Sequence, residues 1–238
     1  MKQWKTIGVL GGMGPYATVY MYQCLLDEAH RQTHAIQDDE YPPILINSVS
    51  LKGSSDHGVP NTPIVRTTLV KGIKTLEQAG AEIIIMPCIS AHSMYEALRS
   101  VATVPVLNLL DIVQSVFEQS MSKRVLLLSS DEGYTLLQQH LLRRKYLRII
   151  VPNQQGQHAV TALIRGCMGG YVQRSVKDKV TSMIHTVVKE RHIHDVILGC
   201  TELPLAITDI DSTIQLHDPV RIAAKLVIQR SYEGEKNI

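Results

Sequence analysis

The sequence predicts an α/β protein built from two similar units that contain parallel sheets. Short apolar runs of strand length alternate with longer helical segments along the 238 residues, and this alternation is typical of parallel sheets covered by helices on both faces. The second half also repeats the first, because three segments recur in the same order. KTIGVLGGMGPYAT at 5–18 corresponds to KRVLLLSSDEGYT at 123–135, GAEIIIMPCIS at 80–90 to HDVILGCTE at 194–202, and VPVLNLLD at 104–111 to TIQLHD at 213–218.

Elements alternate regularly up to residue 120. Strands are predicted at 6–10, 44–48, 82–86 and 104–107, and helices at 15–34, 63–80, 91–100 and 111–120. Pro15 and Pro63 suit first helical turns, where a missing N–H costs nothing, and Gly80 ends the second helix. Between the second strand and that helix lies a polar loop at 50–61, which is longer than a connector requires. It is either a variable surface loop or part of a pocket rim.

The second half follows the same pattern. Strands are predicted at 124–129, 147–151, 195–198 and 213–216, and helices at 134–144, 157–166, 172–191 and 218–232. Ligands of parallel sheets bind beyond the carboxyl ends of the strands. Cys88, Cys200 and the turns at 11–14 and 129–133 all lie at such ends. We therefore expect the site in the cleft between the two halves.

The two thiols at matching strand ends indicate the chemistry. A thiolate on one side of a carbon and a thiol on the other can remove a proton and return it from the opposite face, which inverts a stereocentre without a cofactor. Both cysteines precede segments read as helix starts, a position that lowers a thiol pKa from about 8.5. His92 lies one helical turn after Cys88, so a Cys–His nucleophile is an alternative. Cys24 and Cys167 read as small buried hydrophobes.

Composition excludes several other classes. The net charge of +2 gives no electrostatic basis for binding nucleic acid or a membrane surface, and no apolar run approaches the length of a membrane span. The four cysteines include no Cys-x-x-Cys pair, so we expect free thiols in the cytoplasm, with no leader peptide. His192 and His194 lack a third ligand, so no metal is expected. The turn at 12–17 formally matches a dinucleotide pattern, but Pro15 and the Asn47-Ser48 strand end argue against a nicotinamide cofactor.

Three motifs carry a resemblance to a known family. GVLGGMGPYAT at 8–18, MPCISAH at 86–92 and LGCTELP at 198–204 together resemble the aspartate/glutamate racemase family, most of all its aspartate racemase and broad-specificity amino-acid racemase branch. The resemblance implies two Rossmann-like subdomains related by a pseudo-twofold, with the C-terminal helix returning to the first. These would be residues 1–109 plus 217–238, and residues 110–216. It also implies cofactor-independent racemisation by Cys88 and Cys200, and a homodimer.

The motifs also suggest the residues that contact the substrate, an amino acid or small carboxylate. They are Gly12, Met13, Ser48, Ile89, Ser90, Ala91, Thr201 and Glu202, with His92 and Glu202 as candidates for tuning the thiol pKa values. The sequence departs from the family pattern at three places: Ile89 replaces an asparagine, Lys52 is the nearest cation where an arginine is usual, and Met168 stands where a lysine is usual. A related cysteine-dependent isomerase or decarboxylase of a small dicarboxylate, or a non-catalytic metabolite-binding relative, are the alternatives.

Overall fold

A computed structural model describes residues 3–118, 124–141, 147–208 and 210–233. The first sheet is parallel, in the order β3-β2-β4-β5. Its strands are β2 (Ile7–Gly11), β3 (Ile44–Ser48), β4 (Ile83–Ile85) and β5 (Val106–Leu107), and its helices are α1 (Pro15–Thr33), α2 (Pro63–Gln78) and α3 (Tyr95–Val101). Two 3₁₀ turns, η1 (Asp38–Glu40) and η2 (Ser90–Met94), complete this half.

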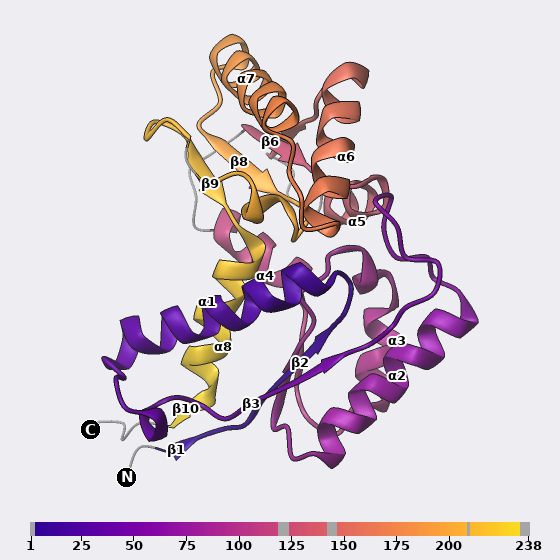
Figure 1. Cartoon of the computed structure of the whole chain (residues 1–238), viewed down its shortest axis with the longest axis vertical. Helices are drawn as coiled ribbons and strands as arrows, with labels where there is room; N and C mark the ends of the chain where they lie inside the picture. The colour runs from indigo at the N-terminus through magenta and orange to yellow at the C-terminus, as the bar shows by residue number, and fades with distance from the viewer. Residues whose placement is uncertain (1–2, 119–123, 142–146, 209, 234–238) are drawn as a thin grey trace.

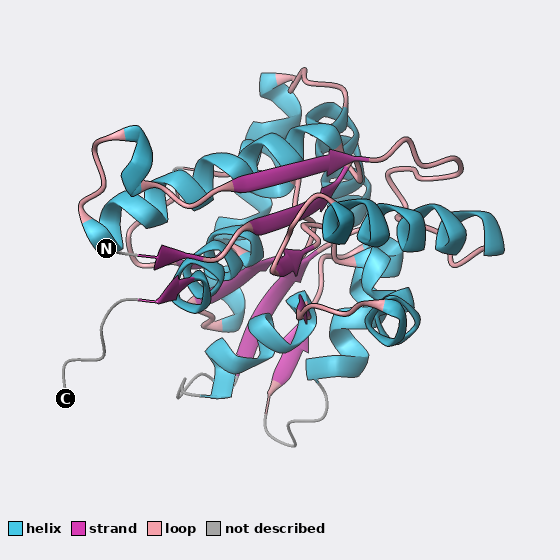
Figure 2. Cartoon of the chain, turned by 90° about the horizontal axis from the view of Figure 1, so that it is seen from below, coloured by secondary structure: helices cyan, strands magenta, loops and turns pink. Residues whose placement is uncertain are grey.

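The second sheet repeats this arrangement in the order β7-β6-β8-β9, again with parallel strands. Its strands are β6 (Arg124–Leu128), β7 (Arg148–Ile150), β8 (Asp195–Leu198) and β9 (Gln215–His217). The helices later in the chain are α4 (Leu109–Glu118), α5 (Asp131–Leu141), α6 (Gln154–Met168), α7 (Arg174–Arg191) and α8 (Pro219–Ser231), with a 3₁₀ turn η3 (Leu203–Leu205). Helices flank the strands of both sheets (Figure 2), so the predicted α/β class with two parallel sheets is confirmed.

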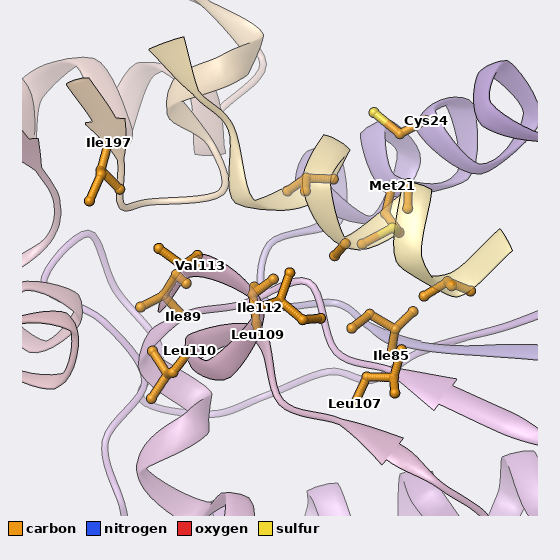
Figure 3. Close-up of a cluster of buried hydrophobic side chains, with 14 of the residues drawn as sticks. Met21, Cys24, Ile85, Ile89, Leu107, Leu109, Leu110, Ile112, Val113 and Ile197 are labelled. Atoms are coloured by element: carbon orange, nitrogen blue, oxygen red, sulfur yellow. The ribbon is translucent and has the colours of Figure 1, made fainter. Parts of the chain in front are cut away.

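One apolar cluster joins the two halves. Helix α8 returns to the first half and packs along α1 (Figure 1). Around α4, side chains of the first half such as Ile85 and Ile89 share a buried cluster with Ile197 of the second sheet (Figure 3). Separate clusters fill the space under α2 and α3 and under α6 and α7. The division at 109/110 and 216/217 stays a prediction.

Several predicted boundaries differ from the observed ones. The helix expected at 91–100 is η2 followed by α3, because the chain after Ile89 first takes 3₁₀ spacing, with the N–H of His92 bonded to the Ile89 carbonyl. Helix α6 begins earlier than expected, since the Asn153 side chain accepts from the Gly156 N–H and caps it. A two-residue pair, β1 (Gln3–Trp4) with β10 (Tyr232–Glu233), was not anticipated. The predicted helix ends at 120 and 144 lie outside the described residues.

The turn after β2 delivers the first loop of the site. Gly12 has φ +93, a left-handed conformation that favours glycine. A Cβ at Gly12 would also collide with the main chain of Val49, which continues β3. The N–H of Gly12 donates to Thr18 Oγ1 at 2.9 Å, and the N–H of Val49 donates to the Gly11 carbonyl at 3.1 Å. These contacts fix the direction in which the next residues, Met13 and Gly14, leave the sheet.

No helix within the described ranges has both the length and the apolar character that crossing a bilayer requires.

Candidate active site

A small cavity lies where the two halves meet, with an empty volume of about 360 Å³ including its open mouth. Segments that follow strands in both halves form its wall. The lining residues are Met13, Gly14, Ser54, Ser55, Asp56, Gly58, Val59, Cys88, Ile89 and Ser90 from the first half, and Ser130, Ile164, Met168, Gly199, Cys200, Thr201 and Glu202 from the second. The two matched cysteines therefore line one cavity from opposite halves of the chain.

Cys88 lies between β4 and η2, one residue before Ile89, which is the N-cap of η2. Its sulfur lies 3.5 Å from Ser90 Oγ, and that hydroxyl accepts the N–H of Val59 at 3.1 Å. Burial raises the pKa of the Cys88 thiol to about 11, and the nearby Glu202 carboxylate adds to this. The Ser90 hydroxyl and the main-chain N–H groups of Ala91 and Ser90 offset part of the increase. The expectation of a lowered pKa is wrong here, because a five-residue 3₁₀ turn does not compensate for burial.

Cys200 follows β8 and Gly199 and has a different environment. Its thiol donates to Glu202 Oε2 at 3.0 Å. Burial raises the pKa of Cys200 well above its usual value, and the charge of Glu202 and this hydrogen bond raise it further. Cys88 also contributes to the increase, so the two sulfurs lie within electrostatic range of each other. The expected lowering of the pKa is therefore wrong for this thiol too, and Cys200 is held in its protonated form.

Glu202 connects the two halves at the cavity. The residue is 5% exposed. One carboxylate oxygen accepts the N–H of Gly14, from the first half, at 3.0 Å, and the other accepts from Thr201 Oγ1 at 3.2 Å as well as from Cys200. A buried carboxylate requires several donors to offset its lost hydration. Glu202 has three such donors: the Gly14 N–H, the Thr201 hydroxyl and the Cys200 thiol, which lines the cavity.

His92 contacts the main chain around Cys88 rather than its sulfur. Leu109 N donates to His92 Nε2 at 3.0 Å, so Nδ1 is assigned as the protonated nitrogen, and it donates to the Cys88 carbonyl at 2.7 Å. Burial lowers the pKa of this imidazole to about 4, which keeps it neutral. His92 thus ties the Cys88 turn to the start of α4. Its part in tuning the thiol stays a prediction, and any such influence passes through the main chain.

The cavity wall contains most, but not all, of the residues predicted to bind substrate. Met13, Ile89, Ser90, Thr201 and Glu202 line it together with the two cysteines. Gly12, Ser48 and Ala91 are not among the lining residues: Gly12 shapes the turn before Met13, Ser48 ends β3, and Ala91 directs its N–H to the Cys88 sulfur.

Sequence reasoning left the other part of the wall undecided, because the loop at 50–61 was expected to be either a variable surface loop or part of a pocket rim. The loop at 50–61 does line the cavity, through Ser54, Ser55, Asp56, Gly58 and Val59. Its length was the available signal, although length alone does not identify which residues face inward. Ile164 and Met168 of α6 also line the cavity. Ile164 follows the helical spacing of core residues, so nothing in the sequence separates it from the core, whereas Met168 was marked by the family resemblance as standing where a lysine is usual.

Comparisons with known proteins agree with this geometry. Residues 10–227 match the family described as Asp/Glu/hydantoin racemase. The broad-specificity amino-acid racemase RacX of Bacillus subtilis (strain 168) is 25% identical over 224 residues, covering 93% of this chain and 96% of that protein. An aspartate racemase homologue from Pyrococcus horikoshii OT3 superposes with a TM-score of 0.78 at 25% identity, over 95% of this chain and 99% of the other.

Two further structures extend the likeness. The aspartate racemase of Picrophilus torridus gives a TM-score of 0.75 at 25% identity, over 95% of this chain and 94% of the other. The glutamate racemase RacE1 of Bacillus anthracis, at 15% identity and a TM-score of 0.65 over 95% and 82%, shares the fold. The family match spans nearly the whole chain and includes both cavity cysteines. This chain belongs to the Asp/Glu/hydantoin racemase family and is an isomerase of the racemase type.

Proposed function

We propose that this chain is a cofactor-independent amino-acid racemase that inverts Cα by proton transfer between Cys88 and Cys200. The observation that carries the proposal is that these two thiols line one cavity from opposite halves of the chain. A substrate held between them would present opposite faces of its α-carbon to the two sulfurs. The B. subtilis relative RacX is a broad-specificity amino-acid racemase, which supports the same class of substrate.

The two thiols would have different resting roles. Hydroxyl and N–H donors surround the Cys88 sulfur, whereas the Cys200 thiol donates to a carboxylate, so Cys88 is the base that takes the α-proton. The electrons of the broken C–H bond stay on Cα and delocalise into the substrate carboxylate. The S–H bond of Cys200 then breaks and its proton bonds to the opposite face of Cα, which leaves Cys200 as the thiolate. Reaction of the other enantiomer reverses every step.

The cavity wall favours amino acids whose side chains carry no negative charge. Glu202 brings a carboxylate to the wall. The guanidinium of Arg165 is already paired with Asp56, at 2.7 Å. Apolar side chains, among them Ile164 and Met168, form much of the remaining surface. A second carboxylate on the substrate would therefore face like charge and apolar atoms, and both are unfavourable.

This wall predicts an order of substrates, which a screen in deuterated water tests together with the function. Each amino acid is incubated separately with the protein, and deuterium at Cα and optical inversion are read for the same sample. We expect neutral amino acids such as methionine and leucine to exceed aspartate and glutamate in kcat/KM by about tenfold or more, since tenfold corresponds to about 1.4 kcal/mol of repulsion. Inversion that is fastest with aspartate would overturn the substrate class alone. No exchange with any amino acid would overturn the proposed function.

The activity is expected to rise with pH across the neutral range. Catalysis needs the Cys88 thiolate, whose pKa is raised to about 11, together with the Cys200 thiol, whose pKa burial and Glu202 raise well above its usual value. Below both values the thiolate fraction grows about tenfold per pH unit, and kcat/KM should follow it. Rates measured with a neutral amino acid between about pH 6.5 and 8.5 test this. A rate that is flat or falls over this range would contradict the assignment of Cys88 as the base.

A further inference from the structure

A loop of the first half crosses to the second half beside the cavity. Residues 51–59, here called the strap, follow β3 and precede α2, and Figure 1 shows this loop reaching α5 and α6. Five of its residues line the cavity: Ser54, Ser55, Asp56, Gly58 and Val59. The mouth of the site is therefore closed partly by chain from one half that is held against helices of the other.

Three contacts hold the strap on the second half. Asp56 Oδ2 accepts from Arg165 Nε at 3.0 Å and from Arg165 Nη2 at 2.7 Å. The N–H of Glu132 donates to the His57 carbonyl at 3.2 Å, and His57 Nδ1 lies 2.7 Å from Asp131 Oδ2. The Asp56 side chain is 12% exposed, whereas those of His57 and Asp131 are both more than 60% exposed. The Arg165 side chain is itself 73% exposed, so the Asp56–Arg165 pair is the principal anchor because Asp56 is largely buried and accepts two hydrogen bonds, whereas the pair of His57 and Asp131 is exposed on both sides and contributes little.

The strap also reaches the proposed base. Val59 N donates to Ser90 Oγ at 3.1 Å, and the same oxygen lies 3.5 Å from Cys88 Sγ. Because the Val59 N–H occupies a lone pair of this hydroxyl, the Ser90 proton is left to point elsewhere, and the Cys88 sulfur is within its reach. Next to Val59, Gly58 packs so closely on α5 that a Cβ there would lie 2.5 Å from Glu132 Oε2. The position of Val59 is thus set by how the strap sits on the second half.

We propose that Asp56 and Arg165 are positioning residues that act on Cys88 through Val59 and Ser90. With the strap seated, the Ser90 hydroxyl donates to the Cys88 sulfur and stabilises the thiolate. With the anchor released, Val59 leaves Ser90 and the hydroxyl is free to turn away. Seating of the strap over the cavity and stabilisation of the Cys88 thiolate therefore occur together. This inference rests on the proposed racemase function, because it takes Cys88 as the base.

Arg165→Met tests the anchor, with kcat/KM measured against pH for a neutral amino acid. Losing one hydrogen bond to a thiolate is expected to raise the apparent pKa of the base by about one and to lower kcat/KM about tenfold at pH 7.5. Ser90→Ala should give the same change by removing the hydroxyl itself. The double variant should be no worse than either single variant, because both act on one contact. Arg165→Lys, which keeps a cation near Asp56, should restore part of the rate.

Arg31→Met is the matched control, because it removes an exposed arginine from an ion pair with Glu28 near the C-terminal end of α1, and neither residue lines the cavity. It should leave the pH profile unchanged. If Arg165→Met lowers the rate but leaves the pH profile in place, or if its effect adds fully to that of Ser90→Ala, the positioning role is overturned. Failure of the unaltered protein to racemise any amino acid would instead overturn the proposed function.

Discussion

Replacing either cavity cysteine by alanine is expected to abolish racemisation, whereas replacing either of the other two cysteines is not. A positioned acid or base contributes roughly 10²–10⁴-fold to a proton transfer. Cys88→Ala removes the group that takes the proton, and Cys200→Ala removes the group that returns it from the other face. Each should therefore lower kcat/KM for inversion by about 10³-fold. Circular dichroism of the amino acid, followed over time, measures this rate directly.

Cys24→Ala and Cys167→Ala supply matched controls, because all four cysteines are free and these two are also buried. Burial, with the Asp218 carboxylate next in effect, raises the pKa of Cys24 to about 12, so it is a poor substitute base. We expect both controls to keep the rate of inversion and to lose about 1 kcal/mol of stability, a usual cost for a buried truncation. Thermal unfolding of all four variants separates lost folding from lost catalysis.

Comparing Cys88→Ala with Cys200→Ala also distinguishes a mechanism that uses one thiol from a mechanism that uses two. A related isomerase or decarboxylase that uses a single cysteine would tolerate one of the two substitutions far better than the other. A two-thiol racemase tolerates neither, because inversion needs a group on each face of Cα. One variant that retains inversion within tenfold of the unaltered rate would contradict the proposal.

The sequence is enough to predict the sheets and both cysteines because these depend on local patterns. The fully buried strand β2 and the apolar run that ends at Cys88 have the composition of buried strands wherever they occur. The repetition of that pattern before Cys200 then predicts a second sheet with its site residue at the same end. Parallel topology brings those ends together, which is why the cavity was expected in the cleft.

The contacts that shape the site are not local, so they could not be predicted. Asp56 and Arg165 lie 109 positions apart, and Gly14 and Glu202 lie 188 positions apart. Their pairing depends on how the two halves pack together, which no pattern within either half specifies. The thiol pKa values were predicted in the wrong direction for the same reason. A helix start can be recognised from the local sequence. The burial of each thiol and its closeness to the Glu202 carboxylate, which raise the pKa values, exist only once the two halves have packed together.

Glu202→Gln is expected to lower the pKa of Cys200, so that its thiol ionises more readily. The carboxylate raises the pKa of Cys200 both by its charge and by accepting the thiol hydrogen, and its charge also raises the pKa of Cys88. An amide has no net charge, and its NH₂ group can donate to a thiolate. Both thiol pKa values should therefore fall, that of Cys200 most. Alkylation by iodoacetamide at pH 8, located by peptide mass, should accelerate at Cys200 by about tenfold for each pKa unit lost.

The kinetic consequence follows from the role of Cys200 as the acid. Inversion needs this residue protonated while Cys88 is ionised, so lowering its pKa narrows the pH range in which the pair is correctly charged. The profile of kcat/KM, which should rise throughout the neutral range in the unaltered protein, should instead pass through a maximum at lower pH in Glu202→Gln. Because the two enantiomers of an amino acid have equal free energy, kcat/KM falls equally for both.

Glu28→Gln makes the same change in charge at a buried carboxylate of α1, which pairs with Arg31 and does not line the cavity, and should leave alkylation and the pH profile unaltered. The glutamine at 202 can still accept the N–H of Gly14, so the link between the halves should survive at a cost of about 1 kcal/mol. Unchanged alkylation of Cys200 combined with a large loss of stability would mean that Glu202 only joins the two halves. Faster alkylation with little loss of stability would show that its charge keeps the acid protonated.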